Sequence, residues 1–361
     1  MGGGASHEGD GMKGIVLLGD RKLELREFPD PTPGPRDVVL EIKASGMCGS
    51  DLHVYRAPFT PLDRASGFSR AAAPVIAGHE PCGVVAAVGT GVSPREARIG
   101  QRVMDHHYAG CGSCKHCRSG WAQMCLEGPI VFGANGNGGH AKYMKVPVAT
   151  LVPLPDALSF ETGAAIACGT GTAYAALRRL QLRGGETIAI FGQGPVGLSA
   201  TQLAVAMGAH VIALDVMAER RALARQFGAH AVIDAKSNNP LEAILELTHG
   251  EGAHKTLDTS GAAEARAMAV RAARSFGTAG FVGERGQVTL DVSKDLLRRQ
   301  ITLVGCWTFS IQGQAECAEF VADRNIAVAQ LFTHRWRLEQ ADEAYRLFDT
   351  QTTGKGVFLP A

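Results

Sequence analysis

Four cysteines lie close together in one short segment, CGSCKHCRSGWAQMC. Their spacing, C-x2-C-x2-C-x7-C, supplies four thiolates, and a structural zinc ion takes a closed tetrahedron of such soft ligands. In a long chain without the features of a secreted protein, clustered thiols favour a metal over disulfides. The segment therefore predicts a structural zinc site, and the alternative is a cluster of free or redox-active thiols. The predicted ligands are Cys111, Cys114, Cys117 and Cys125.

A second group of metal-binding residue types is spread over three segments. GMCGSDLHVY contains Cys48, AGHEPCGVV contains His79 and Glu80, and AIACGTGTAY contains Cys168 at the start of a predicted helix. Two thiols and one imidazole form a ligand set for a zinc ion that keeps its fourth position open. Taken singly, a cysteine or histidine is more often a packed core residue, and for Cys168 that alternative stays open.

The segment TIAIFGQGPVGLSATQLAVAMGAHVIALDV has the pattern strand, glycine turn, helix, strand. The turn G-x-G-x-x-G, residues 192–197, opens the helix, where free backbone N–H groups bind a pyrophosphate. Asp215 ends the second strand, where a carboxylate accepts hydrogen bonds from ribose hydroxyls and repels the 2′-phosphate of NADP. The pattern predicts an NAD site. The alternatives are NADP, favoured by Arg220 and Arg221, and a glycine turn without a nucleotide. The predicted cofactor-binding residues here are Gly192, Gly194, Pro195, Val196, Gly197, Asp215 and Arg220.

The elements that must position these residues fall into two classes. After residue 184, strand-like and helix-like segments alternate, which predicts a doubly wound parallel sheet of the Rossmann type. The first 150 residues contain short runs such as VVLEIKA and GVVAAVG between prolines and glycines, a pattern typical of an antiparallel β-rich domain. Near the end, an amphipathic helix (LEQADEAYRLFDT) and a strand (GKGVFLP) resemble a return to that first domain.

Composition limits the class of protein. The chain has 361 residues, of which 45% are hydrophobic and 20% charged, so we expect two soluble globular domains. A net charge of +1 without a long basic run argues against nucleic-acid and membrane partners and favours a small molecule. No segment has the length of an apolar membrane span or the pattern of a secretory signal, which favours the cytoplasm. Residues 1–11 are expected to form a flexible extension.

Together these segments resemble the zinc-dependent alcohol dehydrogenases of the medium-chain dehydrogenase/reductase superfamily. The most specific match is GHEPCGVVAAVGTGV, which fits the zinc motif of that family. The resemblance implies an α/β protein: a Rossmann-type domain, and a β-rich, GroES-like catalytic domain split in sequence around it. The implied boundaries are 12–168 for the catalytic domain with its structural-zinc lobe, 169–308 for the NAD-binding domain and 309–361 for the return. A homo-oligomer, either a dimer or a tetramer, is also implied.

The resemblance also implies roles for single residues. Cys48, His79 and Cys168 would hold a catalytic zinc ion, with Glu80 beside it as a neighbouring or transient ligand, and the four clustered cysteines would hold the second zinc ion.

Two further residues match the proton relay of the family, Ser50 and His53, and Thr172 matches a nicotinamide contact. Asp51 is expected to orient a neighbouring zinc ligand. His106 and His107, which lie near a strand end, are included in neither ligand set.

The implied reaction is reversible hydride transfer from an alcohol to NAD, which gives an aldehyde or a ketone. Polyol and threonine dehydrogenases typically carry an acidic residue in place of Cys168, so a simple alcohol is expected and a polyol or amino alcohol is the alternative. Two further alternatives are a zinc-free quinone or enone reductase and a non-enzymatic nucleotide-binding protein. The long segment after Cys48, with Tyr55, Phe59 and Phe68, either shapes the substrate pocket or is a surface loop.

Overall fold

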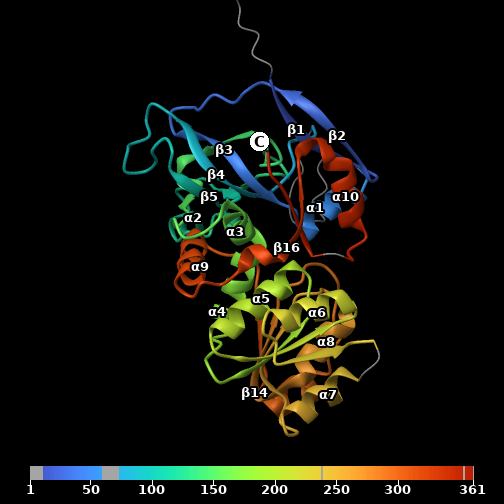
Figure 1. Ribbon diagram of the computed structural model, residues 1–361. Helices are drawn as coiled ribbons and strands as arrows, with labels where there is room; N and C mark the ends of the chain where they lie inside the picture. The colour runs from blue at the N-terminus through green and yellow to red at the C-terminus, as the bar shows by residue number, and fades with distance from the viewer. Residues whose placement is uncertain (1–10, 59–72, 237–238, 353, 361) are drawn as a thin grey trace, which may run out of the picture.

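The computed structural model describes residues 11–58, 73–236, 239–352 and 354–360. Residues 1–10, which make up most of the expected N-terminal extension, and Phe59 and Phe68 of the expected pocket segment lie outside the described residues. Two large sheets of different class organise the described chain, one in the upper half and one in the lower half of Figure 1. Among the described residues, no helix combines the length and the apolar character that a membrane crossing needs.

The lower half is built on a parallel sheet with the strand order β12-β11-β10-β13-β14-β15. Parallel neighbours need crossover connections, and four helices provide them between β10 and β14. This order is that of a dinucleotide-binding Rossmann sheet, so the predicted fold of this segment is confirmed. The elements are β10 (Thr187–Phe191), α5 (Pro195–Ala206), β11 (His210–Asp215), α6 (Ala218–Gln226), β12 (Ala231–Asp234), α7 (Pro240–Leu247), β13 (Ala253–Asp258), α8 (Ala263–Ala272), β14 (Ala273–Phe281) and β15 (Thr302–Gly305).

The upper half contains a largely antiparallel sheet with the order β16-β17-β3-β4-β5-β9, in which β8 also pairs with β3. Its last strand along the chain, β17, pairs with β3 near the N-terminus, and α10 lies beside α1 through ring contact of Tyr345 with Tyr55. The predicted return of the chain to its first domain is therefore confirmed. The elements are β1 (Met12–Gly19), β2 (Lys22–Phe28), β3 (Asp37–Gly46), α1 (Gly49–Arg56), β4 (Glu80–Val88), β5 (Arg102–Asp105), β6 (Tyr108–Ala109), α2 (Lys115–Arg118), β7 (Ile130–Val131), β8 (Tyr143–Pro147), β9 (Leu151–Pro153), β16 (Phe332–Trp336), α10 (Ala341–Asp349) and β17 (Lys355–Phe358).

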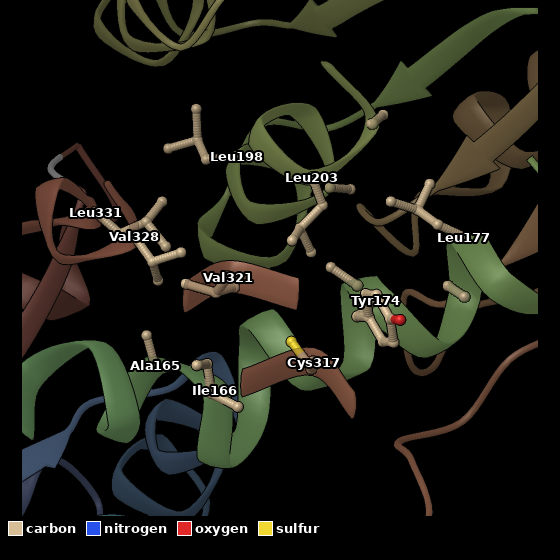
Figure 2. Close-up of a cluster of buried hydrophobic side chains, with 14 of the residues drawn as sticks. Ala165, Ile166, Tyr174, Leu177, Leu198, Leu203, Cys317, Val321, Val328 and Leu331 are labelled. Atoms are coloured by element: carbon tan, nitrogen blue, oxygen red, sulfur yellow. The ribbon is translucent and has the colours of Figure 1, made fainter. Parts of the chain in front are cut away.

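One hydrophobic cluster runs across the junction of the two halves (Figure 2). It joins α3 (Phe160–Ala165), α4 (Gly171–Arg179) and α9 (Ile311–Asp323) to α5 of the parallel sheet, for example through Tyr174, Leu203 and Val321. Because this core is continuous, it fixes the glycine turn before α5 relative to the segment that carries Cys168. The domain boundaries at 168/169 and 308/309 stay predictions.

The sequence pattern predicted that Cys168 begins a helix, and this prediction is wrong. The helix starts earlier, at α3, where the Ser159 side chain accepts a hydrogen bond from the Thr162 N–H. Between α3 and α4 the chain widens into a π-helical turn, Ile166–Thr170, which contains Cys168. Such turns often occur at functional sites because the extra residue redirects a side chain.

Candidate functional site

The structure brings four predicted metal-site residues together from three parts of the chain. Cys48 precedes α1, His79 directly precedes β4, Glu80 is the first residue of β4, and Cys168 lies in the π-helical turn. One sulfur, nitrogen or oxygen atom from each of these residues lies within 4.8 Å of the others. The elements meet here because β4 pairs with β3, which leads directly into α1, and the π-helical turn packs on β4.

The two sulfurs of this group have the separation expected of zinc ligands. Cys48 Sγ and Cys168 Sγ lie 3.9 Å apart. Two sulfurs that are each about 2.3 Å from a tetrahedral zinc ion lie roughly 3.8 Å apart. A hydrogen bond with the Cys168 side chain holds the pKa of the Cys48 thiol well below its ordinary value; burial opposes this effect and His79 reinforces it. A readily formed thiolate next to a second sulfur and an imidazole fits a zinc ion.

Asp51 holds the imidazole of His79 in one orientation. Asp51 Oδ1 lies 3.1 Å from His79 Nδ1, and Asp51 Oδ2 accepts a hydrogen bond of 2.7 Å from the Cys48 N–H. When Nδ1 donates to the carboxylate, the lone pair of Nε2 is left for a metal, and such outer partners raise the basicity of the ligand. This contact agrees with the expected role of Asp51, and that His79 is a metal ligand stays a prediction.

Lys355, which sequence reasoning missed, completes the surroundings of Glu80. Its Nζ lies 2.6 Å from Glu80 Oε1 and donates to the Met47 carbonyl at 2.9 Å. Burial lowers the pKa of Lys355, but nearby Glu80, Cys48 and Cys168 raise it above its ordinary value, so the side chain stays cationic. The signal in the sequence was a lysine between two glycines at the start of an apolar strand, GKGVFLP.

The two predicted relay residues lie on α1 beside the metal group. Ser50 Oγ lies 3.2 Å from His79 Nε2, and His53 is three residues further along, so both share one face of the helix. His53 is half-buried. Burial, together with the charges of Arg285 and Arg56, lowers its pKa below the ordinary value. At neutral pH the ring is therefore uncharged and can accept a proton.

The four clustered cysteines also converge, with their sulfurs within 4.8 Å of one another. Cys117 Sγ lies 4.0 Å from Cys111 Sγ and 3.5 Å from Cys114 Sγ. Backbone N–H groups that bond to its sulfur lower the pKa of Cys114 to about 6. The chain wraps so tightly that a Cβ on Gly110 would lie 2.4 Å from Cys117 Sγ, which explains a glycine there.

The glycine turn before α5 has the features of a phosphate-binding turn. A Cβ on Gly197 would lie 1.9 Å from the Gly192 carbonyl oxygen, so this residue must be glycine for helix and strand to pack. A Cβ on Gly194 would meet nothing closer than Arg220 Nη1 at 4.0 Å, so the backbone there is open to a ligand. Pro195 and Val196 form the first turn of α5, while Thr172 lies half-buried in the first turn of α4.

Asp215 supports this turn through hydrogen bonds from two backbone N–H groups. Its Oδ2 accepts a hydrogen bond of 2.6 Å from the Gln193 N–H, and its Oδ1 accepts one of 2.8 Å from the Met217 N–H. Arg220 Nη1 lies 3.9 Å from Asp215 Oδ2, and Arg220 Nη2 donates to the Gln351 carbonyl at 2.8 Å.

Two family models match most of the chain. Residues 34–156 match the alcohol dehydrogenase GroES-like domain, and residues 195–324 match the zinc-binding dehydrogenase domain. The chain is also 39% identical over 358 residues to the zinc-type alcohol dehydrogenase-like protein YphC of Escherichia coli (strain K12), covering 96% of this chain and 98% of that protein. The chain belongs to the zinc-type alcohol dehydrogenases of the medium-chain dehydrogenase/reductase superfamily.

Other members of this zinc-type alcohol dehydrogenase family are similar over nearly the whole length. An alcohol dehydrogenase of Rhizobium meliloti (strain 1021) is 33% identical over 315 residues, which is 87% of this chain and 88% of the relative. The solved structure of alcohol dehydrogenase TADH from Thermus sp. ATN1 superposes with a TM-score of 0.87 at 27% identity, over 97% of this chain and all of that one. The predicted family and fold class are confirmed, and the chain is an oxidoreductase of the dehydrogenase class.

Proposed function

We propose that this dehydrogenase oxidises an alcohol to an aldehyde or ketone with NAD, at a zinc ion held by Cys48, His79 and Cys168. The observation that carries the proposal is the 3.9 Å separation of Cys48 Sγ and Cys168 Sγ, two residues 120 positions apart in the chain, next to an oriented imidazole. Glu80 would stay beside the ion without binding it, because its carboxylate is paired with Lys355. A second zinc ion would be held by the four clustered cysteines.

The residues of α1 would handle the proton that leaves the alcohol hydroxyl. A zinc ion bound at this site would supply Lewis acidity that lowers the pKa of that hydroxyl. Ser50 is within hydrogen-bond distance of His79 Nε2, which supports the proposal that its hydroxyl would accept the proton at the metal group. His53 on the same helix face is uncharged at neutral pH and would pass the proton to solvent.

The glycine turn and Asp215 would hold the cofactor, and Thr172 would contact its nicotinamide. NAD is favoured because the Asp215 carboxylate, at the end of β11, would accept hydrogen bonds from a ribose and would repel a 2′-phosphate. Arg220, 3.9 Å from that carboxylate, is the residue that would favour NADP. The cytoplasm and a homo-oligomeric assembly stay predictions from the sequence.

The test combines metal analysis with an activity assay. We expect two zinc ions per chain and alcohol-dependent formation of NADH, followed by its absorbance. Cys48→Ser should lose one zinc ion and reduce turnover at least roughly a hundredfold, because thiolate ligation is lost. Cys306→Ser, a buried cysteine outside both metal groups, is the matched control. An active preparation without zinc would indicate a zinc-free reductase instead, and wild-type turnover in Cys48→Ser would refute the proposed site.

A further inference from the structure

His107 is a buried polar residue that lies against the proposed zinc site without belonging to it. It follows β5, and its side chain lies among rings: the centroid of His79 is 5.2 Å away, that of Tyr108 4.2 Å and that of Phe309 6.0 Å. Only 2% of the residue is exposed. The group of candidate metal ligands around Cys48 does not include it, so the structure calls for another reason to keep an imidazole here.

One nitrogen of this ring is committed to the backbone beside Cys168. His107 Nδ1 lies 2.9 Å from the carbonyl oxygen of Ala167. A carbonyl can only accept, so Nδ1 carries the hydrogen and donates it. A buried imidazole without an acidic partner is more stable uncharged. In the uncharged ring with hydrogen on Nδ1, Nε2 has a lone pair and acts as an acceptor only.

That acceptor is open to a ligand. Within the described part of the chain, Nε2 of His107 has no hydrogen-bond partner, and it is not among the fully buried atoms that lack one. Nε2 is therefore not sealed, and the ring that carries it lies against His79 of the proposed zinc site. The neighbouring His106 differs, because its Nδ1 contacts Gln314 Oε1 at 3.1 Å while its Nε2 is sealed.

We propose that His107 determines substrate specificity by accepting, through Nε2, a hydrogen bond from a second hydroxyl group of the substrate. The substrate class is then a diol or polyol rather than the simple alcohol that Cys168 favours by resemblance. An alcohol without a second hydroxyl would displace water from Nε2 and leave the acceptor unpaired, which lowers the rate constant for that substrate. This inference rests on the proposed zinc- and NAD-dependent oxidation.

The test compares alcohols of one carbon skeleton. Values of kcat/KM are measured with NAD for propylene glycol, n-propanol and isopropanol, so that the diol is matched to both monoalcohols. We expect the wild-type protein to favour the diol by at least roughly tenfold, the effect of one unpaired buried group. His107→Asn places an amide nitrogen where Nδ1 was, so the hydrogen bond to the Ala167 carbonyl can persist. The asparagine side chain has no atom at the position of Nε2, so the acceptor is lost. The diol-to-monoalcohol ratio should fall to about one.

Two further variants separate the acceptor from packing. His107→Gln places an amide at the position of Nε2, and it should retain most of the preference for the diol. His106→Asn makes the same truncation at the neighbouring histidine with the sealed Nε2, and the ratio should stay as in the wild-type protein.

The outcomes distinguish this inference from the proposed function. A wild-type ratio near one, or an unchanged ratio in His107→Asn, would overturn the role of His107 while zinc-dependent oxidation of the monoalcohols still stands. Failure to reduce NAD with every alcohol would overturn the proposed function and this inference with it. If His107→Asn does not fold, as judged by its zinc content and circular dichroism, the wild-type and His107→Gln ratios decide.

Discussion

The ammonium group of Lys355 lies 2.6 Å from the carboxylate of Glu80, and both side chains are almost completely buried. The pair joins the last strand of the chain, β17, to the first residue of β4, directly after His79. Lys355 also donates to the Met47 carbonyl, next to Cys48. A single buried lysine therefore pairs with Glu80, the residue after His79, and bonds to the backbone of the residue before Cys48.

Removing this cation should be costly. Lys355→Met leaves a buried carboxylate without a partner, and we expect the free energy of unfolding to fall by about 3–5 kcal/mol. Lys355→Met combined with Glu80→Gln should recover most of that loss, since no charge is left unpaired. Urea unfolding measures the free energy of unfolding of both variants. The control is Arg346→Met, which breaks an exposed ion pair with Asp342 on α10 and should lower the free energy of unfolding by less than about 1 kcal/mol. A double variant as unstable as Lys355→Met would contradict this account.

The cysteine lobe should stabilise the junction between the two sheets. Gly120 accepts a hydrogen bond from the Ile311 N–H, and Gln123 Nε2 donates to the Phe309 carbonyl, so the lobe holds the chain where α9 begins. We expect Cys114→Ser to lower the zinc content from two ions to one and the melting temperature by at least roughly 5 °C. His116→Ala lies in the same lobe outside the ligand group and should keep both ions. Two ions retained in Cys114→Ser would exclude this cysteine as a ligand.

Asp215 should set the choice of cofactor. Asp215→Asn removes the negative charge that would repel the 2′-phosphate of NADP, and we expect the NAD-over-NADP ratio of kcat/KM to fall roughly tenfold to a hundredfold. Asp234 offers a control. It is in register with Asp215 at the end of the neighbouring strand, and it pairs with Arg221. Asp234→Asn should leave the ratio as it is. An unchanged ratio in Asp215→Asn would mean that another residue discriminates between NAD and NADP. Arg220 would then be the next residue to substitute.

Protonation of His53 should determine how kcat for alcohol oxidation falls at acidic pH. Burial and the nearby charges of Arg285 and Arg56 lower its pKa, so the ring binds a proton only below about pH 6.5 and loses its relay function there. We expect kcat for alcohol oxidation to decline below that pH. His53→Gln should lower kcat roughly a hundredfold at neutral pH, and added imidazole buffer should restore part of the rate. If the variant matches the wild-type profile without imidazole, the proton leaves by another route.

Spacing alone predicts the residues whose partners are close in the sequence. The distant set Cys48, His79 and Cys168, whose two cysteines are 120 positions apart, is predicted only with the help of the family resemblance. The four clustered cysteines lie within fifteen positions, and the glycine turn with Asp215 lies within one strand-turn-helix-strand unit, so spacing alone identifies them. Lys355 and Glu80 are 275 positions apart, and His107 contacts Ala167 across 60 positions. Only the pairing of β17 with β3 and the packing of the π-helical turn on β4 and β5 create those neighbours.

The pairing of β17 with β3 bears on how the protein is made on the ribosome. Synthesis proceeds from the N-terminus, and domains generally fold as their residues emerge. Here the strands around Cys48 and His79 emerge early, but the lysine that neutralises Glu80 follows only after the whole nucleotide-binding segment. We therefore expect the β-rich region to complete its folding late in translation, because the Glu80 carboxylate has no partner until Lys355 has been synthesised.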